Sequence, residues 1–223
     1  MSIFDTFLNV RVFIETLPLI LSGLSTTLLL GLVCIVIGFA AGLLLALMRL
    51  YAATPLRQLT VAYIDVFRAI PILVLLFVIY YALPFAGIRL DSFSSATTAI
   101  SMVAAAYSAE IMRAGIEAVP QGQFEAARAL GLPPWLVMAK VVLPQAIKIV
   151  IPPLTSNSIN VIKDTALSSV VAMPDLLKQA NQAQALAANP TPLIVAAVIY
   201  LIILLPLVRL AALFENRPGR SKP

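Results

Sequence analysis

Long apolar runs alternate with short polar segments along the chain. Five stretches have the length and hydrophobicity of membrane-crossing helices, at about residues 24–48, 64–83, 96–115, 141–170 and 193–214. Each offers roughly the 20 mostly apolar residues that a helix needs to cross about 30 Å of hydrocarbon. Their apolar residues form long runs rather than the one-sided stripe of a soluble amphipathic helix. The pattern predicts an all-α integral membrane protein with about five transmembrane helices in a single domain over residues 1–223.

Local features distinguish the predicted spans. Residues 24–48 contain no charge and carry Gly38 and Gly42, whose spacing lets another helix approach closely. Pro71, in the second stretch, is expected to kink a helix or to begin one. Before the first span, residues 3–20 mix apolar side chains with charged ones, which predicts a short interfacial helix.

Composition supports the membrane assignment and excludes several function classes. Of 223 residues, 61% are hydrophobic and 11% are charged, against about 45–50% and 25% in ordinary soluble domains. The 15 Lys and Arg residues are scattered singly, which argues against nucleic-acid binding despite a net charge of +5. The sequence has no histidine for a Ser-His-Asp triad or a zinc–histidine site, and no Gly-x-x-x-x-Gly-Lys-Ser/Thr phosphate loop. We therefore expect neither enzymatic activity, nor a metal site, nor ATP hydrolysis by this chain.

The basic residues predict the orientation in the membrane, because Lys and Arg are enriched in cytoplasmic loops. With the N-terminus outside, the inner side holds Arg49, Arg57, Arg113, Arg128, Lys140, Arg209, Arg217, Arg220 and Lys222. The outer side holds only Arg11, Arg89 and Lys178. The N-terminus is therefore predicted outside and the C-terminus inside, which makes residues 116–140 a cytoplasmic loop.

The loop at 116–140 contains a helix–glycine–helix pattern. Good helix formers run from Glu125 to Leu130, and Gly131 is a natural helix stop. A second turn or helix follows, in which Trp135 suits the membrane interface. We expect a rigid element that protrudes from two spans on the cytoplasmic side.

This loop resembles the EAA loop of ATP-binding-cassette importer permeases, whose pattern is Glu-Ala-Ala, three residues, Gly, nine residues, Ile, one residue and Leu-Pro. The spacing from Glu125 through Gly131 to Leu143-Pro144 fits throughout, with Val141 in the Ile position as the only departure. The resemblance implies a type I importer permease bundle whose short helix docks in a cleft of the ATP-hydrolysing subunit and passes its motion to the membrane helices. The residues implied in this coupling are Glu125, Ala126, Ala127, Leu130 and Gly131.

Three further segments are similar to the polar-amino-acid branch of that family, the permeases for histidine, glutamine, arginine or glutamate. These segments are residues 65–71, 106–116 and 162–167. The departures are Asp65, where the branch has Glu, and Ala69-Ile70 in place of Gly-Thr. The resemblance covers roughly residues 17–214, which is nearly the whole chain.

The resemblance also implies partners in the bacterial inner membrane. Two ATPase subunits would bind ATP and Mg, so this chain would need no cofactor of its own. A second permease subunit, identical or related, would complete a path that works by alternating access. An extracytoplasmic solute-binding protein would deliver the polar amino acid.

Charged residues inside the predicted spans need partners, because each costs about 2.5–3.5 kcal/mol at the membrane centre on insertion scales. Asp65 and Arg68 are three residues apart and can meet on one helix face, and so can Glu110 and Arg113. Structural ion pairing near the inner headgroups is the simpler interpretation. A gate or a place on the substrate path is the alternative.

The stretch at 141–170 is the most polar of the five. Polar, irregular backbone at membrane depth is tolerated where protein or a water-filled cavity covers it, so we expect this stretch to line the translocation path. The substrate-path candidates are Asn157, Asn160, Lys163, Asp164, Thr165 and Ser168, together with Glu110 from the third stretch. Asn157 and Thr165 could hydrogen-bond a zwitterion. Asp164 could meet its ammonium group unless Lys163 already neutralises this carboxylate.

Two other functions fit part of the pattern. An ATP-independent secondary transporter or channel subunit would place acidic proton or sodium sites deep in the bundle and would act without an ATPase. A structural membrane scaffold would explain the helices, but it would leave the loop at 116–140 and the polar fourth stretch without a role.

Overall fold

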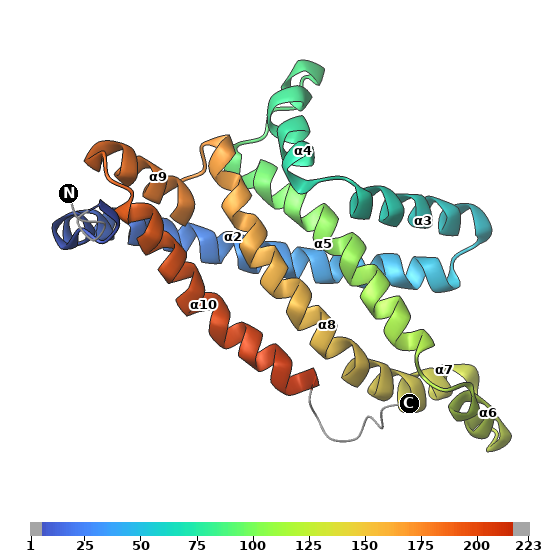
Figure 1. Ribbon diagram of the computed structural model, residues 1–223. Helices are drawn as coiled ribbons and strands as arrows, with labels where there is room; N and C mark the ends of the chain where they lie inside the picture. The colour runs from blue at the N-terminus through green and yellow to red at the C-terminus, as the bar shows by residue number, and fades with distance from the viewer. Residues whose placement is uncertain (1–5, 216–223) are drawn as a thin grey trace.

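A computed structural model describes residues 6–215, all of which lie in helices or short connections (Figure 1). The α-helices are α2 (Val10–Tyr51), α3 (Thr54–Ala69), α4 (Ile72–Phe77), α5 (Ser92–Glu117), α6 (Gln121–Ala129), α7 (Pro134–Leu136), α8 (Leu143–Asp164), α9 (Leu176–Ala187) and α10 (Thr191–Glu215). Two π-helical segments are η1 (Val78–Ala82) and η3 (Val137–Val142), and two 3-10 segments are η2 (Leu83–Ala86) and η4 (Thr165–Val171).

Helix α2 begins earlier than the first predicted span. It has 42 residues, which makes it about 63 Å long at 1.5 Å per residue, or about twice the hydrocarbon thickness. The separate interfacial helix expected at 3–20 is not seen, since residues from Val10 onward belong to α2 and residues 1–5 lie outside the described part. The reason is that Arg11 and Glu15 form an exposed ion pair one turn apart, at 2.8 Å, so their charges require no break in the helix.

The second predicted stretch is not one straight helix. Helices α3 and α4 are separated by a bend of 102° at Ile70-Pro71. Ile70 has an extended backbone, with φ −76° and ψ 133°, which is the conformation that a following proline favours. Pro71 itself is the residue from which α4 starts, in agreement with the expectation that it kinks a helix or begins one.

Three helical segments within residues 6–215 are long and apolar enough to cross a membrane: α2, Pro134–Val171 and Thr191–Leu213. The bent pair formed by α3 and the following helix is a fourth candidate. Helix α5 contains the predicted third span but is not among them, because its many Ala, Ser and Thr residues make it less hydrophobic. It lies in the middle of the bundle, against α2, α3 and α8, where protein rather than lipid covers it (Figure 1).

Helices α2 and α5 approach each other along a row of small residues. A Cβ atom on Gly38 would lie 2.7 Å from the nearest side-chain atom of α5, and one on Gly42 would lie 2.6 Å from Ser108 Cβ. Ala46 and Ala109, both fully buried, continue this contact toward the ends of the two helices. The two glycines therefore do admit a neighbouring helix, as their spacing predicted, and that helix is α5.

The two ends of the bundle are built differently. At one end, α9 and the start of α10 pack around the N-terminal part of α2, in an apolar cluster that includes Ile20 and Leu176. At the other end, α6, α7 and η3 extend past the ends of α5 and α8 (Figure 1) and pack around Val119 and Val142. The protruding element predicted from the loop sequence thus lies at the end opposite the start of α2.

We predict that Gly42→Ala destabilises the protein. The added methyl group would meet Ser108 Cβ at 2.6 Å and the carbonyl oxygen of Ala105 at 3.0 Å, and such overpacking costs about 1–3 kcal/mol. The thermal unfolding midpoint in detergent should fall. Gly122→Ala is the control, because a Cβ atom there meets nothing within 4 Å; equal midpoints for the two variants would contradict the close contact.

Candidate functional site

The protruding element is α6 and the turn that ends it. Gly131 has a left-handed backbone, with φ +77°. Its N–H donates to the carbonyl of Arg128 at 2.9 Å, and the N–H of Leu132 donates to the carbonyl of Ala127 at 3.2 Å. These two bonds form a Schellman motif, the helix ending that favours glycine at this position. We call α6, this turn and α7 the elbow.

The elbow has an inner and an outer face. Ala127 is 4% exposed and packs against Val119, Val137 and Val142 of the same chain. Glu125 and Ala126 are exposed, and the Leu130 side chain is 81% exposed. Of the predicted coupling residues, Ala127 therefore supports the elbow from within, whereas Glu125, Ala126, Leu130 and Gly131 lie on its free surface.

A cavity of about 360 Å³ lies between α4, α5 and α8. It is lined by Ile70, Ile72, Ile100, Val103, Ala104, Tyr107, Asn157, Asn160, Val161, Lys163 and Asp164. Asn157 is 8% exposed, and its amide donates to Ser108 Oγ at 3.1 Å. Four of the predicted substrate-path residues, all from α8, thus share one cavity beside the bend at Pro71.

Two predicted substrate-path residues lie elsewhere. Thr165 and Ser168 are fully buried in η4, and each hydroxyl donates to a backbone carbonyl at 2.6 Å. Ser168 also contacts Asp175 at 3.3 Å. Asp175 is a fully buried carboxylate that accepts from the backbone N–H of Lys178 at 2.7 Å and caps the start of α9. The polar spacing along the sequence did not separate these structural hydroxyls from the cavity residues, because the chain leaves the α-helical period at Thr165.

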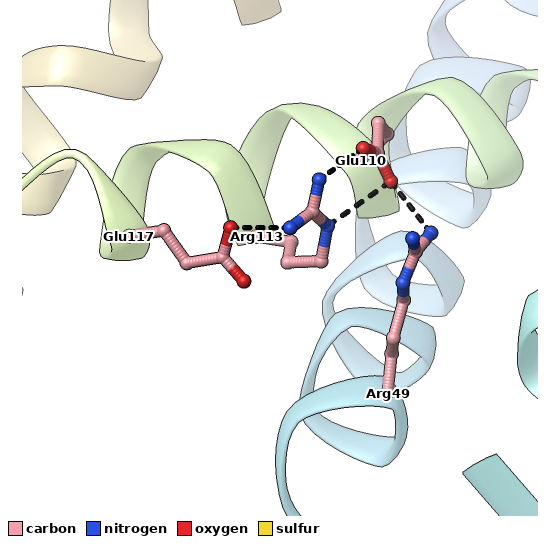
Figure 2. A network of polar contacts seen from close by, with 4 residues as sticks. All are labelled: Arg49, Glu110, Arg113 and Glu117. Atoms are coloured by element: carbon pink, nitrogen blue, oxygen red, sulfur yellow. Dashed lines mark hydrogen bonds and ion pairs between the residues drawn. The ribbon is translucent and has the colours of Figure 1, made fainter.

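Glu110 is the third predicted substrate-path residue that lies outside the cavity. Figure 2 shows its carboxylate between two arginines, Arg49 from α2 and Arg113 from α5. The Arg49 contact measures 2.7 Å. Arg113 contacts both Glu110 and Glu117. We call these four residues the inner network. Arg49 entered the sequence analysis only as a sign of orientation, because only the fold brings α2 to this point. Glu117, four residues after Arg113 on α5, was not singled out.

The predicted pair of Asp65 and Arg68 does not form within the described residues. Both side chains are exposed on α3. The Arg68 guanidinium lies 5.5 Å from the ring centre of Tyr107, and the Tyr107 hydroxyl donates to the Arg68 carbonyl at 3.4 Å. The reason is that Arg68 is in the last turn of α3, where it can reach across to α5 and stack on an aromatic ring.

Basic residues gather at the elbow end of the described bundle. Arg49 lies in the last turn of α2 and contacts Glu110 near the end of α5. Arg128 and Lys140 belong to α6 and η3. At the opposite end the backbone N–H of Asn9 donates to Thr191 Oγ1 at 3.1 Å, which joins the starts of α2 and α10. Arg217, Arg220 and Lys222, which also supported the orientation, lie outside the described residues.

Comparison with known proteins identifies the family to which this fold belongs. Residues 38–220 match the family described as binding-protein-dependent transport system inner membrane components. The chain is 40% identical over 174 residues to the probable glutamine ABC transporter permease protein GlnM of Bacillus subtilis (strain 168), covering 78% of this chain and 81% of GlnM. It is 36% identical over 206 residues to the arginine transport system permease protein ArtQ of the same strain, covering 92% of this chain and 94% of ArtQ.

Solved structures lead to the same class. A crystal structure of an amino acid ABC transporter with histidines contains a chain that is 37% identical, with a TM-score of 0.89, covering 97% of this chain and all of that one. A chain of the inward-facing MetNI methionine ABC transporter shares the fold at 22% identity, with a TM-score of 0.67. The match covers 92% of this chain and 96% of that one.

The fold and the elbow define a transmembrane permease subunit of an ATP-binding-cassette importer. The chain belongs to the family of binding-protein-dependent transport system inner membrane components. It is therefore a multi-pass inner membrane protein and not itself an enzyme, and ATP is bound by a partner ATPase subunit. The all-α fold and the importer class predicted from the sequence are confirmed.

Proposed function

We propose that this permease subunit carries a polar amino acid across the bacterial inner membrane, with its N-terminus outside and its C-terminus inside. The observation that carries the proposal is the cavity beside Pro71, where α8 presents two amides, one cation and one carboxylate. The names of the relatives support the substrate class, since GlnM, ArtQ and the L-cystine transport system permease protein TcyB are all named for polar amino acids.

The chemistry of this cavity suits an amino acid zwitterion. The carboxylate of Asp164 can accept hydrogen bonds from an ammonium group, and the Lys163 ammonium can donate to a carboxylate. Asn160 can donate and accept at a polar side chain, while Asn157 already uses one donor on Ser108. Apolar walls from Ile70, Ile100 and neighbouring residues would exclude water and strengthen these bonds.

A second permease subunit, identical or related, would complete the path. Asn160 and Lys163 are exposed on the single chain, and a charge that faces lipid near the membrane centre costs about 2.5–3.5 kcal/mol on insertion scales. A partner subunit placed over this face would cover both side chains and close the cavity. An external solute-binding protein would then deliver the amino acid at the end formed by α9 and the start of α10.

The elbow would receive the mechanical work. Its outer face carries Glu125, Ala126 and Leu130, a small, partly apolar surface that suits docking in a cleft of the ATPase. Three residues connect the end of α5 to α6, and Val119 among them is 2% exposed within the same apolar cluster as Ala127. A displacement of α6 is therefore expected to move α5 and α8, and with them the cavity, so that two ATPase subunits drive alternating access.

The first test is to purify the tagged chain and identify what accompanies it. We expect an ATPase subunit and a second permease subunit in the complex, and ATP hydrolysis that rises on addition of a polar amino acid with its solute-binding protein. Transport by this chain alone, without any ATPase, would favour a secondary transporter or channel instead.

We predict that Gly131→Val abolishes amino acid uptake while leaving membrane insertion intact. The left-handed backbone at Gly131 strains any β-branched residue, so the turn that orients α6 should be lost. Uptake into proteoliposomes and the amount of inserted protein are the two measurements. Gly87→Val is the matched control, because Gly87 also has a positive φ, +85°, but lies between η2 and α5; equal losses in both variants would speak against a special role of the elbow.

We predict that Asp164→Asn raises the amino acid concentration needed for half-maximal stimulation of ATP hydrolysis. Losing a hydrogen bond to a charged group costs about 1.5–3 kcal/mol, which corresponds to roughly tenfold or more in affinity. Asp65→Asn is the control, since that carboxylate is exposed on α3 and does not line this cavity. An unchanged concentration dependence in Asp164→Asn would remove Asp164 from the substrate path.

A further inference from the structure

The inner network joins two helices through a single side chain. Glu110, Arg113 and Glu117 all belong to α5, whereas Arg49 alone comes from α2 (Figure 2). We propose that Arg49 is a positioning residue that locks the end of α2 to α5, so that the two helices move as one body when the elbow is displaced. This inference rests on the proposed coupling to an ATPase.

Side chains of α5 orient the Glu110 carboxylate, which accepts the hydrogen bond from Arg49. Glu110 and Arg113 are three residues apart and Arg113 and Glu117 are four apart, so the three side chains follow one face of the helix. Arg113 donates to both oxygens of the Glu110 carboxylate, and one of them, Oε2, also accepts from Arg49 at 2.7 Å. The side chains of Arg49 and Glu110 are each 22% exposed, and this partial burial strengthens a charge-assisted bond relative to one on the open surface.

The remaining contacts between α2 and α5 are of a different kind. Gly42 lies against Ser108, and Ala46 lies in one apolar cluster with Ala109. Such small side chains allow a close approach. Within the described residues, the other hydrogen bond between these two helices is a weak one, from Cys34 Sγ to the carbonyl oxygen of Thr97 at 3.9 Å. The bond between Arg49 and Glu110 is short, directional and charge-assisted. It can therefore fix the register that the small residues leave free.

The inner network lies next to the elbow, where a displacement of α6 by the ATPase would first reach the bundle. Glu117 is the last residue of α5, and α6 starts four positions later at Gln121. On the other side, α2 ends two residues after Arg49, and α3 follows after a short turn at Ala52-Ala53. Because α3 leads to Ile70 in the wall of the cavity, a fixed link at Arg49 lets a shift of the elbow reach that wall through α2 and α3 as well as through α5.

The test compares transport with ATP hydrolysis in the purified complex reconstituted in proteoliposomes. For Arg49→Gln we expect the number of amino acids transported per ATP hydrolysed to fall about fivefold or more, the lower end of a typical coupling between two sites. Arg49→Lys keeps the charge and should stay near the wild-type ratio. Arg11→Gln is the matched control, because it breaks an ion pair on the same helix that is exposed and joins no second element; it should leave the ratio unchanged.

Two results would overturn the role of Arg49. One is an unchanged ratio in Arg49→Gln. The other is a parallel fall of transport and ATP hydrolysis, which would mean that Arg49 only supports folding. A wild-type complex without amino-acid-stimulated ATP hydrolysis would instead refute the proposed function, so the two failures can be told apart.

A covalent link tests whether the two helices stay together. The double variant Arg49→Cys with Glu110→Cys should transport few amino acids per ATP hydrolysed, and a short thiol crosslinker should restore the wild-type number. The native Cys34 is fully buried and should not react, and the wild-type complex treated with the same reagent is the control. If crosslinking blocks transport, the helices must separate during the cycle and the proposal is wrong.

Discussion

The close contact between α2 and α5 is the constraint on which the other parts of this permease depend. Helix α5 is central and rich in small residues, and Gly38 and Gly42 let α2 lie directly against it. Because the hydrophobic effect does not drive helices together within lipid, such contacts depend on close van der Waals packing. The two regions to which we assign proposed functions both border α5, with the cavity on one of its faces and the elbow at its end.

The polar side chains of residues 157–175 fall into two groups, those bonded within the chain and those that face the cavity. Thr165, Ser168 and Asp175 are buried, and each is bonded to backbone or to another of these side chains. Asn160, Lys163 and Asp164 face the cavity, and none of them donates or accepts a side-chain hydrogen bond within the described residues. In a membrane, polar side chains that face a cavity without a hydrogen-bond partner in the chain need one from outside it. A second subunit and a passing substrate are the partners that the proposed function supplies.

The elbow was well predicted because its determinants are local. The run from Glu125 to Leu130 followed by Gly131 specifies a short helix with a left-handed ending, and the Schellman bonds at Gly131 and Leu132 have that geometry. The exposure of its residues was harder to foresee. Ala127 and Ala126 are neighbours with the same side chain, yet Ala127 packs inside the chain and Ala126 is exposed, because the helix rotates by about 100° per residue.

The sequence by itself determined the membrane-embedded all-α class, the elbow and the bend at Pro71, since apolar run length, helix stops and proline geometry act over a few residues. Glu110 and Arg113 meet as their spacing predicted, but the tertiary structure decided the other charge contacts. Asp65 and Arg68 have the spacing of a pair but are drawn apart, because Arg68 reaches Tyr107 on another helix. Glu110 was assigned to the substrate path, but α2 brings Arg49 to it from 61 residues away. Spacing along one helix specifies which side chains can meet, whereas the packing of a second helix specifies which of them do.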